Sequence, residues 1–130
     1  MTREEKQLLL IDLSARLTYG VKCVSGVDDA TLIIEGINPN SNGASEVQVT
    51  YERSGINFDT KISSIKPYLF PLSSMTEEQK KEYQYITERW MYDSSYSISD
   101  SADWLNAHHF DFRNLISRNL AIDCTNLNIY

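Results

Sequence analysis

Apolar residues near the start of the chain recur every three to four positions, which is the period of an α-helix. This stripe consists of Leu9, Leu10, Leu13 and Leu17. The polar residues of the segment, Asp12 among them, are expected on the other faces. Thr2 and Glu5 match the pattern of a capping box, in which each residue bonds the backbone of the other. The pattern therefore predicts an amphipathic helix over residues 2–17 rather than a signal peptide.

The pattern changes after Gly20 to short segments that are rich in β-branched and aromatic residues. Turns containing Gly, Asn, Asp and Pro separate them, which is typical of antiparallel strands. The predicted strands are Val21–Ser25, Ala30–Ile37, Glu46–Tyr51 and Phe58–Ile65. In the next segment, Lys66–Ser74, two prolines exclude a regular helix. Because its other residues are largely apolar, we expect an extended strap packed along the sheet.

The helical period returns at Thr76, which forms a second capping-box pattern with Gln79. This helix is predicted to run to about Tyr92. A serine-rich loop, Asp93–Ser101, follows it. A short third helix is predicted over about Ala102–His109, with the last serine of the loop as its N-cap.

Together these elements predict an α+β fold in a single domain over residues 1–130. An N-terminal helix precedes a small antiparallel sheet or SH3-like open barrel of about four to five strands, and two C-terminal helices pack on it. Residues 1–72 hold the first helix, the sheet and the strap, and residues 73–130 form the helical C-terminal part. We expect a last short strand in LAIDC, residues 120–124, and expect Tyr130 to pack back on the core.

Composition and charge narrow the classes of function. The chain is 42% hydrophobic and 23% charged, as in ordinary globular proteins. No apolar run approaches the roughly 20 residues of a membrane-spanning helix, so we expect a cytoplasmic protein without membrane contact. The net charge is −6, and residues 77–103 carry much of it. The chain has no cluster of Lys and Arg, which argues against direct contact with nucleic acid.

The segment DWLNAHHFDFRNLI, residues 103–116, contains both histidines of the chain. Adjacent residues on a helix point about 100° apart, and helical zinc pairs need a spacing of three or four. His108 and His109 therefore form no local chelating pair, but with Asp111 they remain the candidates for a metal or hydrolytic site. The alternative is structural: the histidines end the helix, and apolar residues dock it on the body. These apolar residues are Trp104, Leu105, Phe110 and Phe112.

The two cysteines, Cys23 and Cys124, lie far apart in the sequence and belong to no CxxC motif. Neither lies in a nucleophile motif, although a triad with the histidines depends on geometry that the sequence does not give. We expect both to be small buried residues. No glycine-rich phosphate loop is present, and no cofactor is expected.

Tyrosine is abundant, with eight residues in the chain. An acidic segment that is rich in aromatic residues is typical of a protein-binding surface, but these rings could equally form core between the second helix and the strap. The candidates for a partner surface are Tyr83, Tyr85, Trp90, Tyr92 and Tyr96.

Several strings along the chain resemble a group of small uncharacterised proteins from phages and mobile elements of gut Bacteroidetes. These strings are MTREEKQLLLIDLSARLTYGVK, ISSIKPYLFPLSSMTEEQKKEY, DWLNAHHFDFRNLI and LAIDCTNLNIY. The resemblance covers most of the chain and is weakest over residues 24–57 and the serine-rich loop. It implies a context only, namely an accessory protein in the cytoplasm of a bacterial host cell, and it assigns no activity or site residue.

The sequence thus favours a non-enzymatic, protein-binding accessory module of a phage or mobile element. One alternative is a small barrel associated with nucleic acid, or an acidic decoy that occupies a DNA-binding protein. Another is a small metal-dependent or hydrolytic enzyme around His108, His109 and Asp111. Protein is the expected partner, and the sequence does not indicate an oligomeric state.

Overall fold

The computed structural model describes residues 1–38, 45–89, 91–92 and 98–130. Its helices are α1 (Arg3–Arg16), α2 (Glu77–Arg89) and α3 (Ile98–Ala107). Its longer strands are β1 (Lys22–Ser25), β2 (Thr31–Ile37), β3 (Val47–Tyr51), β4 (Asn57–Thr60) and β5 (Ile65–Pro71). Two strands of two residues each, β6 (Phe110–Asp111) and β7 (Ile122–Asp123), complete the sheet. The chain is therefore α+β with an N-terminal helix, as the sequence predicts.

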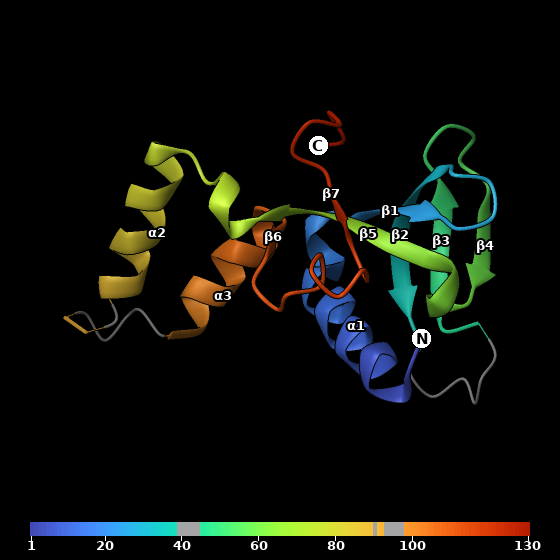
Figure 1. Cartoon of the computed structure of the whole chain (residues 1–130), viewed down its shortest axis with the longest axis horizontal. Coiled ribbons are helices and arrows are strands. Elements are labelled where there is room, and N and C mark those ends of the chain that lie inside the picture. The colour runs from blue at the N-terminus through green and yellow to red at the C-terminus, as the bar shows by residue number, and fades with distance from the viewer. Residues whose placement is uncertain (39–44, 90, 93–97) are drawn as a thin grey trace.

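The molecule is elongated, with α2 and α3 at one end and the strands β2, β3 and β4 at the other (Figure 1). The helix α1 lies between these ends, and β5 runs from the sheet toward the two later helices (Figure 1). This arrangement places α2 far from β4 (Figure 1).

The sheet has the order β4-β3-β2-β1-β5-β6, and β7 pairs with β5 beside this path. The pairs from β4 to β5 are antiparallel, whereas β6 and β7 run parallel to β5. The sheet is open, because within the described residues β4 pairs only with β3. It is also mixed and larger than predicted, with seven strands in the described chain instead of four to five.

The additional strands arise around β5. The predicted strap, Lys66–Ser74, is largely part of this strand, which begins at Ile65. The predicted strand Phe58–Ile65 is divided by a 3₁₀ turn over Ile62–Ser64, so that one predicted strand becomes β4 and the start of β5. The strands β6 and β7 are too short to show a periodic pattern, because two residues do not complete one alternation.

The main hydrophobic core lies between α1 and the sheet. The leucines of α1 pack against buried side chains of β1, β2, β3 and β5 and of the C-terminal segment. Its fully buried members include Leu9, Leu13, Val21, Leu32, Val49, Leu69 and Leu115. The predicted capping box of α1 is confirmed, with both bonds between Thr2 and Glu5 at 3.0 Å. Periodicity and capping therefore identify this helix and its buried face correctly.

A second hydrophobic cluster docks the later helices. Its buried members are Trp104, Leu105 and Phe110, and Phe70, Met75, Tyr83, Ile86 and Phe112 pack around them. Because Phe70 belongs to β5, the helices pack on the C-terminal end of this strand. The helices α2 and α3 were expected to pack on the sheet, but they lie beside it (Figure 1).

The boundaries of the later helices differ from the prediction. The helix α2 has its predicted capping box but ends at Arg89 rather than Tyr92. The helix α3 begins at Ile98, so Ser101 is not its N-cap but a buried residue within it. The Ser101 hydroxyl lies 3.4 Å from that of Thr87 on α2. The remainder of the predicted loop, residues 93–97, lies outside the described residues.

The end of the chain returns to the sheet, as predicted. The expected strand in residues 120–124 is present as β7, and the Tyr130 hydroxyl lies 2.9 Å from the carbonyl oxygen of Tyr68. In the part of the chain that the structure covers, no helix combines the length and apolarity that crossing a membrane requires.

Candidate functional site

The two histidines lie at the C-terminal end of α3, where the structure uses them differently. The backbone amide of His108 donates to the carbonyl oxygen of Trp104 at 3.1 Å, and its ring Nδ1 lies 2.8 Å from the same oxygen. With a proton on Nδ1, the ring caps this carbonyl. The imidazole also stacks on the indole of Trp104 with a centroid distance of 4.1 Å. His108 thus completes the helix end and covers the buried tryptophan.

His109 has a left-handed backbone conformation, with φ at 63°, and its amide donates to Asn106 at 3.1 Å. Its ring is stacked almost parallel on the ring of Tyr130, with centroids 3.7 Å apart. Burial, together with weaker repulsion from Arg16, His108 and Lys22, lowers the pKa of His109 to about 4. At neutral pH the imidazole is therefore uncharged, and its buried Nδ1 has no hydrogen-bond partner.

Asp111, the third candidate, is committed to the backbone. It is 8% exposed and accepts hydrogen bonds from the amides of Arg113 at 3.2 Å, Leu115 at 3.0 Å and Ile116 at 2.9 Å. This carboxylate holds the turn that follows β6. Among the described residues, no three His, Cys, Asp or Glu side chains are grouped to hold a metal ion.

Neither cysteine is placed to act as a nucleophile. Cys23 and Cys124 are free thiols that are 0% and 1% exposed, which confirms the expectation that both are buried. Burial raises the pKa of Cys23 to about 12 and that of Cys124 to about 11. Since the thiolate is the reactive form, both side chains are inert at neutral pH.

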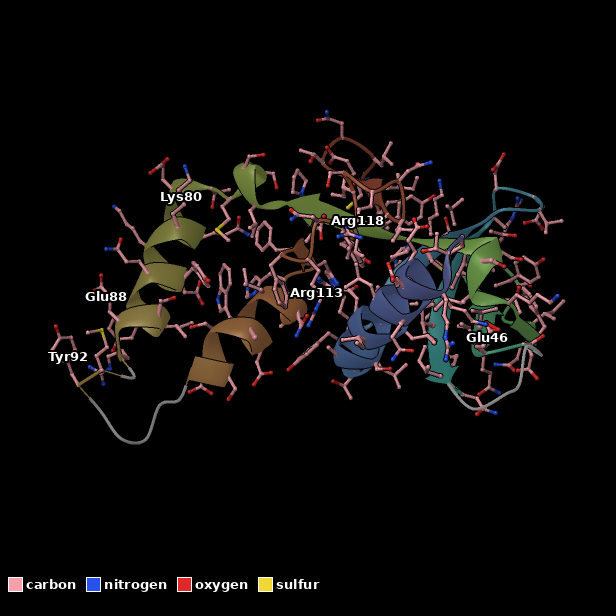
Figure 2. All side chains as sticks on the ribbon, turned by 60° about the horizontal axis from the view of Figure 1, so that its bottom comes forward. Glu46, Lys80, Glu88, Tyr92, Arg113 and Arg118 are labelled. Atoms are coloured by element: carbon pink, nitrogen blue, oxygen red, sulfur yellow. The ribbon has the colours of Figure 1, made fainter. Side chains whose placement is uncertain are left out.

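A buried ionic network connects α1 to the segment after α3. The carboxylate of Asp12 accepts from Nε of Arg16 at 2.9 Å and from Nη1 of Arg113 at 2.6 Å. The Nη2 of Arg16 also donates to the carbonyl oxygen of Phe110 at 2.6 Å. Figure 2 shows Arg113 at the junction between α3 and α1. This network fixes the start of β6 against the first helix.

The network corrects the expectation that Asp12 lies on a polar face of α1, because Asp12 and Arg16 are both 0% exposed. The signal was present in the sequence. Residues 9, 12, 13 and 16 follow the spacing of one helical stripe, and this stripe includes an Asp–Arg pair four residues apart. Polar residues on an apolar stripe indicate a buried pair when a partner of opposite charge is one turn away.

The five aromatic candidates for a partner surface separate into three groups. Tyr83 is partly buried, with its ring 5.5 Å from that of Trp104. Tyr85 and Tyr92 are 54% and 83% exposed. Trp90 and Tyr96 lie outside the described residues. The core hypothesis therefore applies to Tyr83, and the surface hypothesis to the two exposed tyrosines.

The outward side of α2 combines these rings with charge. No described residue of α2 is buried, and the guanidinium of Arg89 lies 5.1 Å from the ring centre of Tyr85. Its exposed charged residues are Glu77, Glu78, Lys80, Lys81, Glu82 and Glu88. Figure 2 shows Lys80, Glu88 and Tyr92 on the outer side of α2, pointing away from the rest of the molecule. We call this side of α2, with the following turn at residues 91–92, the outer α2 face.

Comparison of the chain with models of protein families, with curated proteins and with solved structures finds no significant match.

Proposed function

We propose that this protein is a non-enzymatic module that binds another protein through the outer α2 face. The observation that carries the proposal is the pair of exposed tyrosines, Tyr85 on α2 and Tyr92 in the turn after it. Figure 2 shows Tyr92 at this end of the molecule. Met91, next to Tyr92, is 63% exposed and adds apolar surface. Large aromatic side chains of this kind are the residues that contribute most to protein interfaces.

The position of the two tyrosines suits recognition by a groove. Tyr85 lies on the last turns of α2, and Tyr92 lies in the turn that follows the helix. A groove that accepts the end of a helix can contact side chains of both kinds. Because exposed glutamates outnumber exposed lysines on α2 by four to two, we expect the groove of the partner to have a basic rim.

The contacts of the other candidate residues support a binding role over an enzymatic one. The Asp111 carboxylate is bonded to three backbone amides, His108 caps its helix, and the cysteines are buried with raised pKa values. These groups perform structural tasks that compete with catalysis or metal binding.

The resemblance to proteins of phages and mobile elements supports a more specific proposal. In it, the module is an accessory protein that acts in the cytoplasm of a bacterial host cell. The exposed glutamates also favour one alternative, an acidic decoy that occupies a DNA-binding protein. Such a complex would weaken more steeply with salt than one anchored by aromatic rings.

The experiment compares two double variants in affinity capture from bacterial lysate, followed by titration with the captured protein. The first combines Tyr85→Ala and Tyr92→Ala. The matched control combines Val27→Ala and Ile56→Ala, which remove exposed apolar side chains in loops at the sheet end, at 88% and 62% exposure. One aromatic anchor of about 2 kcal/mol corresponds to about a thirtyfold change in affinity, so loss of both predicts that the tyrosine variant binds about a thousandfold more weakly if the two effects add.

The control variant is expected to bind as tightly as the wild type. The proposal fails if no protein is retained specifically, or if the two double variants bind the retained protein equally well. An affinity that decreases steeply with salt and is unchanged by loss of the tyrosines would support the acidic decoy instead.

A further inference from the structure

The hydrogen-bonded ladder between β1 and β5 is interrupted beside Tyr68. The ladder ends at the pair of Cys23 with Pro67, and β5 pairs again, now with β6, at Phe70. Residues two apart on a strand direct their backbone groups to the same edge. The carbonyl of Tyr68 and the amide of Phe70 therefore face the same side of β5, between the end of one neighbouring strand and the start of another.

The side chain of Tyr130 fills this interruption. The amide of Lys22 donates to the Tyr130 hydroxyl at 2.9 Å, and the hydroxyl donates to the carbonyl oxygen of Tyr68 at 2.9 Å. A phenol hydroxyl thus replaces the direct bond that the next rung of the ladder would make. The strand β5 can change neighbours without leaving Lys22 and Tyr68 unpaired.

The ring of Tyr130 is held by groups that suit any planar aromatic ring. His109 stacks on it at 3.7 Å with an angle of 9° between the planes. The ring of Phe70 lies 6.0 Å away, and the ammonium group of Lys22 lies 5.9 Å from the ring centre. We call the space bounded by Lys22, Tyr68, Phe70 and His109 the phenol slot.

The segment that carries Tyr130 into the slot is otherwise weakly attached. Residues 125–128 are exposed, and Leu127 is 49% exposed although it is apolar. Lys22 adds one bond, from its Nζ to the carbonyl oxygen of Ile129 at 3.1 Å. The segment loops away from the body after β7 (Figure 1). The segment is held to the body by the side chain of Tyr130 and by Lys22.

One polar atom at the slot is left without a partner. Nδ1 of His109 is buried and makes no hydrogen bond, although its ring is the stacking surface for Tyr130. Buried polar atoms are nearly always bonded, so an unpaired one needs an explanation. The Tyr130 hydroxyl does not pair with it, because this hydroxyl is engaged by Lys22 and Tyr68.

We propose that the phenol slot is a binding site for small planar molecules of the phenol class, and that Tyr130 occupies it as an intramolecular competitor. A ligand ring would stack on His109, and its hydroxyl would accept from the Lys22 amide and donate to the Tyr68 carbonyl. Binding requires the segment after β7 to leave. The apparent affinity of the wild type is therefore reduced by the fraction of molecules with an empty slot.

The test uses p-cresol, which has the ring and hydroxyl of tyrosine, and toluene, which lacks the hydroxyl. Because the chain has two histidines, the imidazole carbon-bound protons give separate NMR signals for His109 and His108. In Tyr130→Ala we expect p-cresol to shift the His109 signal with a dissociation constant at least about tenfold lower than in the wild type. Toluene should bind several-fold more weakly, because it leaves the Lys22 amide and Tyr68 carbonyl unbonded.

His108 provides the internal control, since its ring stacks on Trp104 and not on Tyr130. The proposal is overturned if Tyr130→Ala is folded and p-cresol leaves the His109 signal in place, or if toluene binds as tightly as p-cresol. It is also overturned if the wild type forms dimers that exchange this segment, because the slot would then belong to a second copy.

Tyr130→Phe decides the question if the alanine variant does not fold. This variant keeps the stacked ring and loses both hydroxyl bonds, so phenylalanine should compete less well than tyrosine for the slot. We expect p-cresol to bind it more tightly than it binds the wild type. Equal affinity for both proteins would contradict the proposal.

Discussion

Replacing Asp12 by alanine removes the acceptor that neutralises two arginines at the centre of the molecule. Arg16 is 0% exposed, and it would keep only its bond to the carbonyl oxygen of Phe110. Its Nη1 is already buried without a partner. Breaking a buried ion pair by removing one partner costs about 3–5 kcal/mol, because the remaining charge stays desolvated. That is a large part of the about 5–15 kcal/mol by which domains are usually stable.

Arg113 provides a graded comparison within the same network. Its side chain is 20% exposed, whereas that of Asp12 is 0% exposed. If Arg113 is replaced by alanine, Asp12 keeps its two bonds from Arg16. We therefore expect Arg113→Ala to cost about 1.5–3 kcal/mol, the usual range for a hydrogen bond to a charged group, and less than Asp12→Ala.

Urea denaturation followed by far-ultraviolet circular dichroism measures both changes. The control is Glu4→Ala on the exposed side of α1, which should alter the free energy of unfolding by no more than about 0.5 kcal/mol. The reasoning is refuted if Asp12→Ala costs less than about 1 kcal/mol. It is also refuted if Arg113→Ala is the more damaging of the two substitutions.

Three further outcomes concern buried groups outside this network. The pKa of His109 is about 4 in the folded chain, below its ordinary value of 6.5, so the unfolded chain binds more protons in this interval. The contribution of His109 to the free energy of unfolding should therefore be fully present above pH 6.5 and should decrease by at most about 3 kcal/mol as the pH falls toward 4. Urea titrations at several pH values measure this, and His109→Asn should make the free energy of unfolding less dependent on pH. Trp104→Ala should lower the free energy of unfolding by about 3–5 kcal/mol. In this variant the backbone amides of α2 and α3 should exchange their hydrogens faster than those of β2 and β3. Cys23 and Cys124 should react with a thiol reagent only as fast as the protein unfolds; rapid labelling of the folded protein would contradict their burial.

Local patterns in the sequence were sufficient to predict the helices and strands that repeat their apolar positions several times. The helix α1 and the strands β1, β2 and β3 were predicted because each has repeated apolar positions or a clear boundary signal, such as the Thr2–Glu5 capping box. The burial of Trp104, Leu105 and Phe110 also followed from their size and apolarity. In all these cases one segment carries the whole signal.

Contacts between segments that are distant in the sequence could not be predicted from local patterns. The strands β6 and β7 have two residues each and exist because β5 lies beside them. Tyr130 was expected to pack on the core, but its stacking on His109 depends on residues 21 positions apart that meet at an interruption in the sheet. The bond from Arg113 to Asp12 joins residues separated by 101 positions.

The sequence by itself determined the α+β composition, the amphipathic first helix and the burial of the cysteines. Each depends on local propensity, hydrophobic periodicity or residue type, which short segments express on their own. Only the tertiary structure decided that the later helices lie beside the sheet, that Asp12 is buried, and that Tyr130 fills a slot. These outcomes depend on which surfaces meet, because burial and hydrogen bonding between distant residues are fixed only when the whole chain packs together.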